Sequence, residues 1–311
     1  MRVTIVREVQ ETGMGRKIKV GTRKSKLAFV QTEIIINKIK LEAPELSFEI
    51  IPISTVGDEI LNKPLIEFGG KGVFVDAFET ALLEGSIDLA VHSAKDMTMQ
   101  LPEGLGIIGI PEREDPRDVL VTAGRELEAE PSCVIGTSSL RRQFQIEQFY
   151  RAECRSLRGN VQTRLDKLIR GEYDGIILAA AGLKRLKLEE QDQFCYRYFT
   201  TGEFVPAAGQ GILAVEGRIE DELSGIVSRI NDSSTAICLK TERRVLELMN
   251  AGCHEAIGVF SYIEKDMIYI NGVYKKEDRL IRAQEKGVLT EAADLAARIA
   301  DRLGSTCGRN R

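Results

Sequence analysis

Side chains that bind metal ions are scarce in this sequence of 311 residues, which has two histidines and six cysteines. No two cysteines form a CxxC pair, and structural zinc sites normally use such closely spaced ligands, so we predict no metal site. We expect most of the cysteines to be small core residues and not disulfide partners. They are Cys133, Cys154, Cys195, Cys238, Cys253 and Cys307.

Long apolar runs and an excess of positive charge are also missing. No apolar run approaches the ~20 residues that a membrane span needs. Residues 1–17 have neither the apolar centre nor the cleavage site of a secretory signal, so we expect a cytoplasmic protein. The formal net charge is -4, whereas a general nucleic-acid-binding protein normally carries a strongly basic domain. Any anion site must therefore be local.

What remains is the composition of an ordinary globular protein, with 43% hydrophobic and 29% charged residues. The length allows about two domains, or three small ones. Strand and helix patterns alternate from Ile18 onwards, which indicates an α/β fold. Residues 1–17 show no such period, and we find no internal repeat in the sequence.

The stretch 88–96, DLAVHSAKD, ends an apolar run in a small polar cluster that includes Lys95 and Asp96. The pattern predicts a helix that ends at Gly85 and a short buried strand over 87–91. In open α/β sheets, ligands bind at the carboxyl ends of the strands. Asp96 is therefore a candidate catalytic carboxylate. A buried aspartate that accepts loop N–H bonds explains this cluster, taken alone, equally well.

Basic residues recur where predicted strands pass into helices. A strand over 18–20 leads through GTRKS to a helix capped by Ser25, which places Arg23 in a loop near helix N–H groups. Strands over 133–135, 154–157 and 175–178 lead into GTSSLRRQ, a serine-capped helix start, RGNVQTRL and AAAGLKRL. One arginine is usually a solvated side chain, but a set at equivalent strand ends predicts a cradle for carboxylates or phosphates. This set contains Arg141, Arg142, Arg158, Arg164, Lys184 and Arg185.

Several glycine-rich or proline-rich segments punctuate these elements. EFGGKGVF surrounds Lys71 with glycines but lacks the GKS or GKT ending of a Walker A sequence. A mobile surface turn and a substrate-gating loop explain it equally well. Residues 111–120, PEREDPRDVL, predict a crossover between domains, and PAAGQGILAVEGR from Pro206 predicts the return of the chain.

The last third of the chain predicts a small α+β domain. A capped helix over 234–249 ends in NAGCHEAIG, which puts Cys253 on a loop where its thiol could react. A hairpin, a third strand and a final helix over 289–303 follow.

Nine motifs, taken in order, resemble the porphobilinogen deaminase (hydroxymethylbilane synthase) family: GTRKS, GGKG, AVHSAKD, EREDPRD, GTSSLRRQ, SLRGNVQTRL, EYDGIILAAAGLKRL, PAAGQG and AGCHEAIG. Such a series is far more specific than a lone glycine-rich loop. The resemblance implies two domains like type II periplasmic binding proteins, with a cleft between them, and a small α+β C-terminal domain that carries a cysteine loop. The domains it implies are an N-terminal extension over 1–17, domain 1 over 18–112 with 208–229, domain 2 over 113–207 and domain 3 over 230–311.

The chemistry that the resemblance implies is that of a transferase in tetrapyrrole, porphyrin and haem biosynthesis. Its cofactor is a dipyrromethane, one per chain, bound by a thioether to the residue that matches Cys253. Porphobilinogen loses ammonia to give an azafulvene, which the free α-carbon of the terminal pyrrole attacks. Four such units and then water give hydroxymethylbilane. The resemblance further implies a monomer with no nucleic-acid or membrane partner, and uroporphyrinogen III synthase as the downstream enzyme.

The resemblance also assigns site residues. Asp96 matches the catalytic carboxylate, which would stabilise positive charge on a pyrrole nitrogen and handle protons. The other residues would pair acetate and propionate groups, which are costly to bury unpaired. Those for the cofactor are Cys253, Lys95, Ser138, Arg141, Arg142, Arg158 and Arg164, and those for the substrate are Arg23, Ser25, Lys71, Arg158 and Arg185. Three residues depart from the family pattern: Thr98 and Ala256, where proline is usual, and Glu67 in the glycine-rich loop.

Two other functions explain parts of the sequence. A cytoplasmic anion-binding or sensor protein on the same two-domain fold would use the arginines, but it leaves Asp96 and Cys253 unexplained and predicts no covalent adduct. A nucleotide-binding enzyme is a weaker candidate, because the glycine-rich segments lack the strand–GxGxxG–helix context. For the transferase we also expect hinge motion, because each added unit must move the growing chain past one carboxylate.

Overall fold

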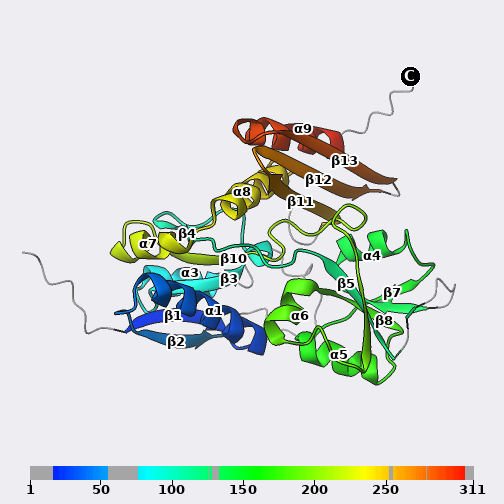
Figure 1. Ribbon diagram of the computed structural model, residues 1–311, viewed down its shortest axis with the longest axis horizontal. Coiled ribbons are helices and arrows are strands. Elements are labelled where there is room, and N and C mark those ends of the chain that lie inside the picture. Colours follow the sequence, from blue (N-terminus) through cyan, green and yellow to red (C-terminus); the bar gives the residue numbers. More distant parts are fainter. Residues whose placement is uncertain are drawn as a thin grey trace, which may run out of the picture.

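The computed structural model describes residues 17–54, 76–124, 126–127, 133–251, 255–277 and 279–304. Within these ranges the chain forms two five-stranded sheets and one three-stranded sheet, each with its own helices (Figure 1). None of the helices in these ranges is long and apolar enough to cross a membrane.

The first sheet has the strand order β2-β1-β3-β10-β4. Its strands are β1 (Ile18–Arg23), β2 (Phe48–Ile53), β3 (Leu89–Ser93), β4 (Leu105–Gly109) and β10 (Leu213–Arg218). Strands β1, β2 and β3 are parallel, and β10 runs antiparallel between β3 and β4. The helices of this part are α1 (Lys26–Glu42), α3 (Asp76–Leu83) and α7 (Glu222–Val227). Apolar residues of α1 and of the strands, among them Ile35 and Val20, form one core.

The second sheet has the order β7-β6-β8-β5-β9. Its strands are β5 (Asp118–Ala123), β6 (Val134–Gly136), β7 (Glu153–Arg155), β8 (Gly175–Ala179) and β9 (Phe194–Tyr198). Three short helices follow its parallel strands: α4 (Leu140–Ile146), α5 (Val161–Ile169) and α6 (Ala180–Leu186). Strand β5 is antiparallel to both β8 and β9.

The two sheets share one topology. In each, three parallel strands are followed by one antiparallel strand and then an edge strand. Along the chain, the antiparallel strand of each sheet comes directly after the edge strand of the other sheet: β5 follows β4, and β10 follows β9. The chain therefore crosses between the sheets twice. This structural repeat has no counterpart as a repeat in the sequence.

The third sheet is an antiparallel meander of β11 (Ile257–Glu264), β12 (Met267–Lys276) and β13 (Arg279–Val288). Helices α8 (Ser233–Leu248) and α9 (Ala292–Gly304) pack on it around Val245, Val259 and Ile299. Three short 3-10 turns complete the described elements: η2 (Ala94–Asp96), η3 (Ser228–Ile230) and η4 (Leu289–Glu291).

The predicted fold class, two α/β units with a small α+β unit after them, is confirmed. Ser25 caps α1 as predicted, because its Oγ accepts a hydrogen bond from the N–H of Ala28 at 3.2 Å. Other details were wrong. Strand β1 runs on to Arg23, so this residue ends a strand and does not lie in a loop. Ser139 stands at the N-cap of α4 but makes no capping bond.

Two further differences involve non-local pairing. The segment over 111–120 was predicted to be crossover throughout, but β5 already begins at Asp118. The sequence also gave no indication of β9. Strand β5 pairs with both β8 and β9. These pairings join distant parts of the chain, so no local pattern indicates them.

Candidate active site

Asp96 lies at the carboxyl end of β3, on the single 3-10 turn η2. Ala94 anchors this turn, because it is buried and its N–H donates to the carbonyl of Ile212 at 3.0 Å. Met97 is buried on the other side of Asp96. Asp96 itself is exposed, so the alternative of a buried structural aspartate is wrong.

Arg141 and Arg142 come from the first turn of α4, at the corresponding edge of the second sheet. Both are buried, and both bind the carboxylate of Asp118, the first residue of β5. The distance is 2.7 Å from Arg141 Nη1 to Asp118 Oδ2, and 2.7 Å from Arg142 Nη2 to Asp118 Oδ1. Burial alone would raise the pKa of Asp118, but the two guanidinium groups lower it to about 2. Asp118 is therefore ionised at neutral pH.

The charge of Asp96 reaches across to the second sheet. It counteracts the effect of burial on Lys95, Arg142 and Arg164, whose pKa values burial lowers. For Arg164, burial and then the charge of Arg142 lower the pKa to about 10. Two carboxylates, those of Asp96 and Asp118, thus share this space with four basic side chains, including that of Arg141.

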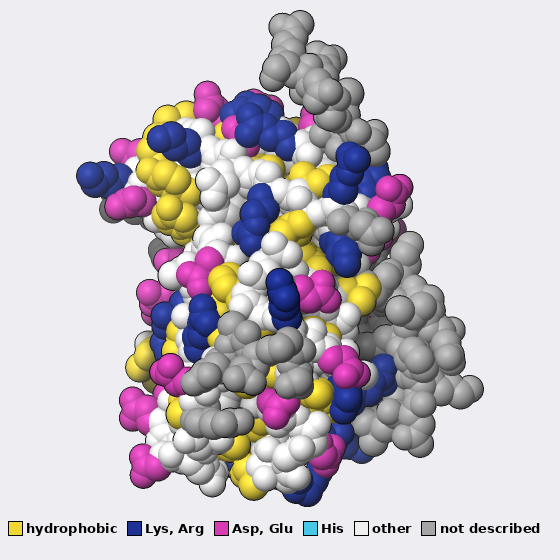
Figure 2. All heavy atoms as spheres, turned by 90° about the vertical axis from the view of Figure 1, so that its right-hand side faces the viewer, with side chains coloured by type: hydrophobic (Ala, Val, Ile, Leu, Met, Phe, Trp, Pro, Cys, Tyr) yellow, Lys and Arg dark blue, Asp and Glu magenta, His cyan; other side chains and the backbone are white. Residues whose placement is uncertain are grey.

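This local excess of positive charge determines which ligands the site can bind. Buried cations that repel one another favour an anion with several negative groups, because each new ion pair removes part of that repulsion. On the face shown in Figure 2, by contrast, lysine and arginine side chains are interspersed with aspartate and glutamate side chains. The site between the two sheets can therefore take a polyanion on a protein whose net charge is -4.

Helices α1 and α6 bring the two sheets together (Figure 1). Arg185, on α6, donates from Nη2 to the carbonyl of Gly211 at 2.7 Å, so it contacts the segment that returns to the first sheet. Burial lowers the pKa of Arg185 to about 10, and Glu114 opposes the shift. The neighbouring Lys184 binds Glu114 at 3.3 Å. These two basic residues therefore contact the two crossovers.

The remaining predicted residues occupy the same two sheet edges. Ser138 donates from Oγ to the carbonyl of Leu157 and accepts from the N–H of the same residue, at 2.9 and 3.0 Å. Arg158 lies in the turn before α5, half-buried. Arg23 and Ser25 stand at the carboxyl end of β1, which is parallel to β3. The structure thus gathers the predicted basic residues at two facing sheet edges.

Three sequence features lie outside the described residues: Cys253, Lys71 and Glu67. The assignment of Cys253 to the cofactor and of Lys71 to the substrate stays a prediction. Cys133 and Cys238 are buried core residues, as predicted. Burial raises the pKa of both Cys154 and Cys238 to about 11, which keeps these thiols protonated at neutral pH.

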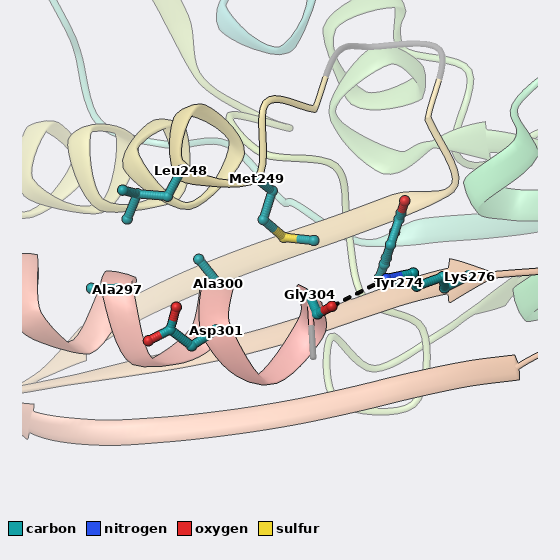
Figure 3. A pocket seen from close by; sticks show the side chains of 8 residues that line it. All are labelled: Leu248, Met249, Tyr274, Lys276, Ala297, Ala300, Asp301 and Gly304. Atoms are coloured by element: carbon teal, nitrogen blue, oxygen red, sulfur yellow. Dashed lines mark hydrogen bonds between the residues drawn. The ribbon is translucent and has the colours of Figure 1, made fainter. Parts of the chain in front are cut away.

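A hollow of about 540 Å³ opens elsewhere, between the end of α8, helix α9 and β12 (Figure 3). Met249 and Ala300 point into it, and Lys276 closes one end through a hydrogen bond to the carbonyl of Gly304 at 3.2 Å. None of the predicted site residues lines it. It is separate from the charged site.

Sequence reasoning missed three residues that support the site. Asp118 was taken as part of a crossover. Glu242 binds Arg113 with two ion-pair contacts, at 2.7 and 3.1 Å, and Arg243 binds the segment after Asp96. The available signal for the pair of Arg113 and Glu242 was the density of charged residues in ERED, over 112–115, and in TERR, over 241–244. Such charged runs usually form solvated surfaces.

Fold and site together define a class: an α/β protein with two similar five-stranded sheets, a cluster of basic side chains between them and a smaller α+β unit. Two family models match the chain. "Porphobilinogen deaminase, dipyromethane cofactor binding domain" matches residues 18–224, and "Porphobilinogen deaminase, C-terminal domain" matches residues 236–305. The chain therefore belongs to the porphobilinogen deaminase family.

Curated relatives agree with this. A porphobilinogen deaminase of Alkaliphilus metalliredigens is 43% identical over 295 residues, which is 93% of this chain and 92% of that protein. One of Acetivibrio thermocellus is 43% identical over 259 residues, 83% of this chain and 87% of that protein.

Solved structures with the same arrangement of elements are more distant. The periplasmic VFT2 domain of Bordetella pertussis BvgS has a TM-score of 0.41 and 13% identity, and covers 68% of this chain and 86% of that chain. Substrate binding domain 2 of Lactococcus lactis GlnP has a TM-score of 0.39 and 10% identity, with 69% and 86% covered.

Proposed function

We propose that this protein deaminates porphobilinogen and condenses four units head to tail into the linear tetrapyrrole hydroxymethylbilane. The observation that carries the proposal is the excess of positive charge at Lys95, Arg141, Arg142 and Arg164 beside one exposed carboxylate, Asp96. Arg141 and Arg142 are buried, and Lys95 and Arg164 are half-buried. Porphobilinogen carries an acetate and a propionate on its pyrrole ring. A growing chain of such rings is the kind of polyanion that this charge excess favours.

The same charges fit a dipyrromethane, the cofactor of the family, because it carries the same carboxylates. When bound, it supplies the pyrrole carbon to which the first substrate unit is joined. Cys253 would hold it through a thioether. Lys95, Ser138, Arg141, Arg142, Arg158 and Arg164 would bind its carboxylates. Arg141 and Arg142 are already held in place by Asp118, so they would bind without losing much side-chain freedom.

Substrate would be bound by a second set of residues, most of them basic. They are Arg23, Ser25, Lys71, Arg158 and Arg185. Asp96 would accept the pyrrole N–H and stabilise the positive charge that develops on the ring during deamination and coupling. It can do so from a fixed position, because buried residues anchor the turn on both sides of it.

The wider role follows from this chemistry. The protein would act as a monomer in the cytoplasm, supply uroporphyrinogen III synthase, and use neither a nucleic acid nor a membrane as partner. We further propose domain boundaries at 112/113, 207/208 and 229/230, and hinge motion at the two crossovers as the chain grows.

The mass of the intact protein tests this function. The wild type is incubated with porphobilinogen, and adducts are mapped to peptides, together with Cys253→Ser and, as a matched control, Cys195→Ser. We expect a dipyrromethane-sized adduct on Cys253 in the wild type and in Cys195→Ser but not in Cys253→Ser. A wild type that gains no adduct and makes no hydroxymethylbilane would instead support an anion-binding protein without chemistry.

Asp96→Asn tests the carboxylate. The amide keeps the shape of the side chain but cannot stabilise the cationic pyrrole, so the rate of hydroxymethylbilane formation should fall about 10²–10⁴-fold. The free energy of unfolding should change by no more than about 0.5 kcal/mol, because Asp96 is exposed. Glu103→Gln, at another exposed carboxyl group, should leave the rate unchanged. Full activity in Asp96→Asn would exclude the role.

A further inference from the structure

Helix α8 contacts the segment that contains Asp96 through a polar and an apolar side chain. Arg243 donates from Nη2 to the carbonyls of Thr98 and Met99, at 2.6 and 3.0 Å. These two residues follow Asp96 by two and three positions. One turn earlier on the helix, the buried Leu239 packs in the same apolar cluster as Ala94 and Met97. Leu239 and Arg243 are four residues apart, so they lie on the same face of the helix.

A third residue of this face supports the same segment indirectly, through Gly209. Glu242 accepts the N–H of Gly209 at 2.7 Å. A Cβ atom on Gly209 would lie 3.0 Å from the backbone nitrogen of Lys95, so this glycine is packed against the turn that holds Lys95 and Asp96. Helix α8 therefore supports the segment over 94–99 both directly and through the return crossover.

The same helix leads to the proposed cofactor residue. Helix α8 ends at Leu248, five residues after Arg243, and Cys253 follows five residues later in the chain. A helix rises about 1.5 Å per residue and bends little over one turn. One rigid element thus joins the segment of Asp96 to residues 249–251, which come just before Cys253 in the sequence.

We propose that Arg243 is a positioning residue for Asp96, through which helix α8 holds the turn of this carboxylate in place. The inference rests on the proposed function. Two backbone carbonyls accept from the one nitrogen Nη2 and so fix the exit of the 3-10 turn, because the N–H bonds of a planar guanidinium have fixed directions. Loss of these two bonds frees residues 98 and 99 and thereby loosens the anchor at Met97, so that Asp96 is held less precisely.

The test compares Arg243→Gln with Arg244→Gln in the holoenzyme. Arg244 is the next residue of α8, but its side chain is exposed and, within the described part of the chain, pairs with Glu247 at 2.7 Å. We expect kcat for hydroxymethylbilane formation to fall about tenfold to a hundredfold in Arg243→Gln with little change in KM, since a misplacement of about 1 Å can cost about 10²-fold. Arg244→Gln should match the wild type. Arg243→Lys, which keeps one donor nitrogen but not the planar geometry, should fall between the two and serves as the test if Arg243→Gln does not fold.

Hydrogen exchange supplies a measurement that does not depend on turnover. Amides over 94–101 should exchange faster in Arg243→Gln than in Arg244→Gln, while β3 itself stays protected. Unchanged exchange in this segment, or a kcat equal to that of Arg244→Gln, would overturn the inference. The proposed function fails separately, if the wild type and Arg244→Gln form no adduct at Cys253 and no hydroxymethylbilane.

Discussion

Asp118 shows how one buried carboxylate can prepare a binding site. It is fully buried and pairs with both Arg141 and Arg142. Each arginine also donates to a backbone carbonyl, Arg141 to Val205 at 2.8 Å and Arg142 to Ile177 at 2.9 Å. Two guanidinium groups are thereby held in one orientation, at the cost of burying three charges.

The depressed pKa of Asp118 gives a dependence of stability on pH. The folded pKa of Asp118 is about 2, against an ordinary pKa of 3.8 for an aspartate. A carboxyl group with a depressed folded pKa contributes stability above its unfolded pKa and loses it as the pH falls through the folded value. We therefore expect Asp118→Asn to lower the free energy of unfolding by about 3–5 kcal/mol at pH 7, because two buried cations lose their partner.

That difference from the wild type should shrink as the pH is lowered from about 4 towards about 2, which denaturant titrations at several pH values would follow. The control is Glu153→Gln in the same domain, which removes an exposed pair with Arg155 and should leave stability unchanged. A deficit in Asp118→Asn that stays constant down to pH 2 would contradict the pairing.

Among the elements, the return crossover before β10 has the most demanding backbone. Gly209 and Gly211 both have a positive φ, of 72° and 87°. Gly209 also has no room for a side chain, since a Cβ would meet the backbone of Lys95 and of Ala94 at 3.0 and 3.1 Å. The motif PAAGQG thus does more than return the chain: it packs backbone against backbone behind the candidate catalytic turn.

Gly209→Ala and Gly85→Ala separate the two effects. Gly85 has nearly the same φ, 71°, but a Cβ there would meet nothing within 4 Å. Both variants should lose about 1–2 kcal/mol of unfolding free energy through the left-handed backbone. Gly209→Ala should lose further unfolding free energy beyond this amount, and it alone should lower kcat, because its Cβ displaces the turn of Lys95 and Asp96. Equal stability and equal kcat in the two variants would show that the close packing has no consequence.

For the molecule as a whole, Glu242 is the point where three parts of the chain meet. This fully buried residue of α8 binds Arg113 of the first crossover and Gly209 of the second. It also accepts the N–H of Ser261, in β11, at 2.7 Å. The third domain is therefore joined to both crossovers by one carboxylate.

Glu242→Gln tests this junction. The amide leaves Arg113 buried without a counter-charge, and the expected loss is about 3–5 kcal/mol of unfolding free energy. Calorimetry should show a lower melting temperature. Glu247→Gln, on the same helix, removes only an exposed pair with Arg244, which is worth about 0.3–0.5 kcal/mol. A melting temperature in Glu242→Gln as high as that of Glu247→Gln would argue against the junction.

Much of the architecture was predictable from local pattern. Consecutive residues are enough to predict the apolar face and the Ser25 cap of α1. The same holds for the long capped helix α8 and for the hairpin of β11 and β12. The strand-end arginines were predictable for the same reason, since each follows its own strand. The match of nine motifs in order pointed to the family, which the family models confirm.

By itself, then, the sequence determined which helices form, which strands end in basic residues and which family the chain belongs to, because these depend on neighbours along the chain. Only the tertiary structure decided that β5 and β10 exchange between the sheets, that Asp118 holds Arg141 and Arg142, and that α8 supports Asp96. These contacts join residues that are far apart in the chain, between 23 and 145 positions. No local pattern specifies such a pairing, since it arises from which surfaces can be buried together.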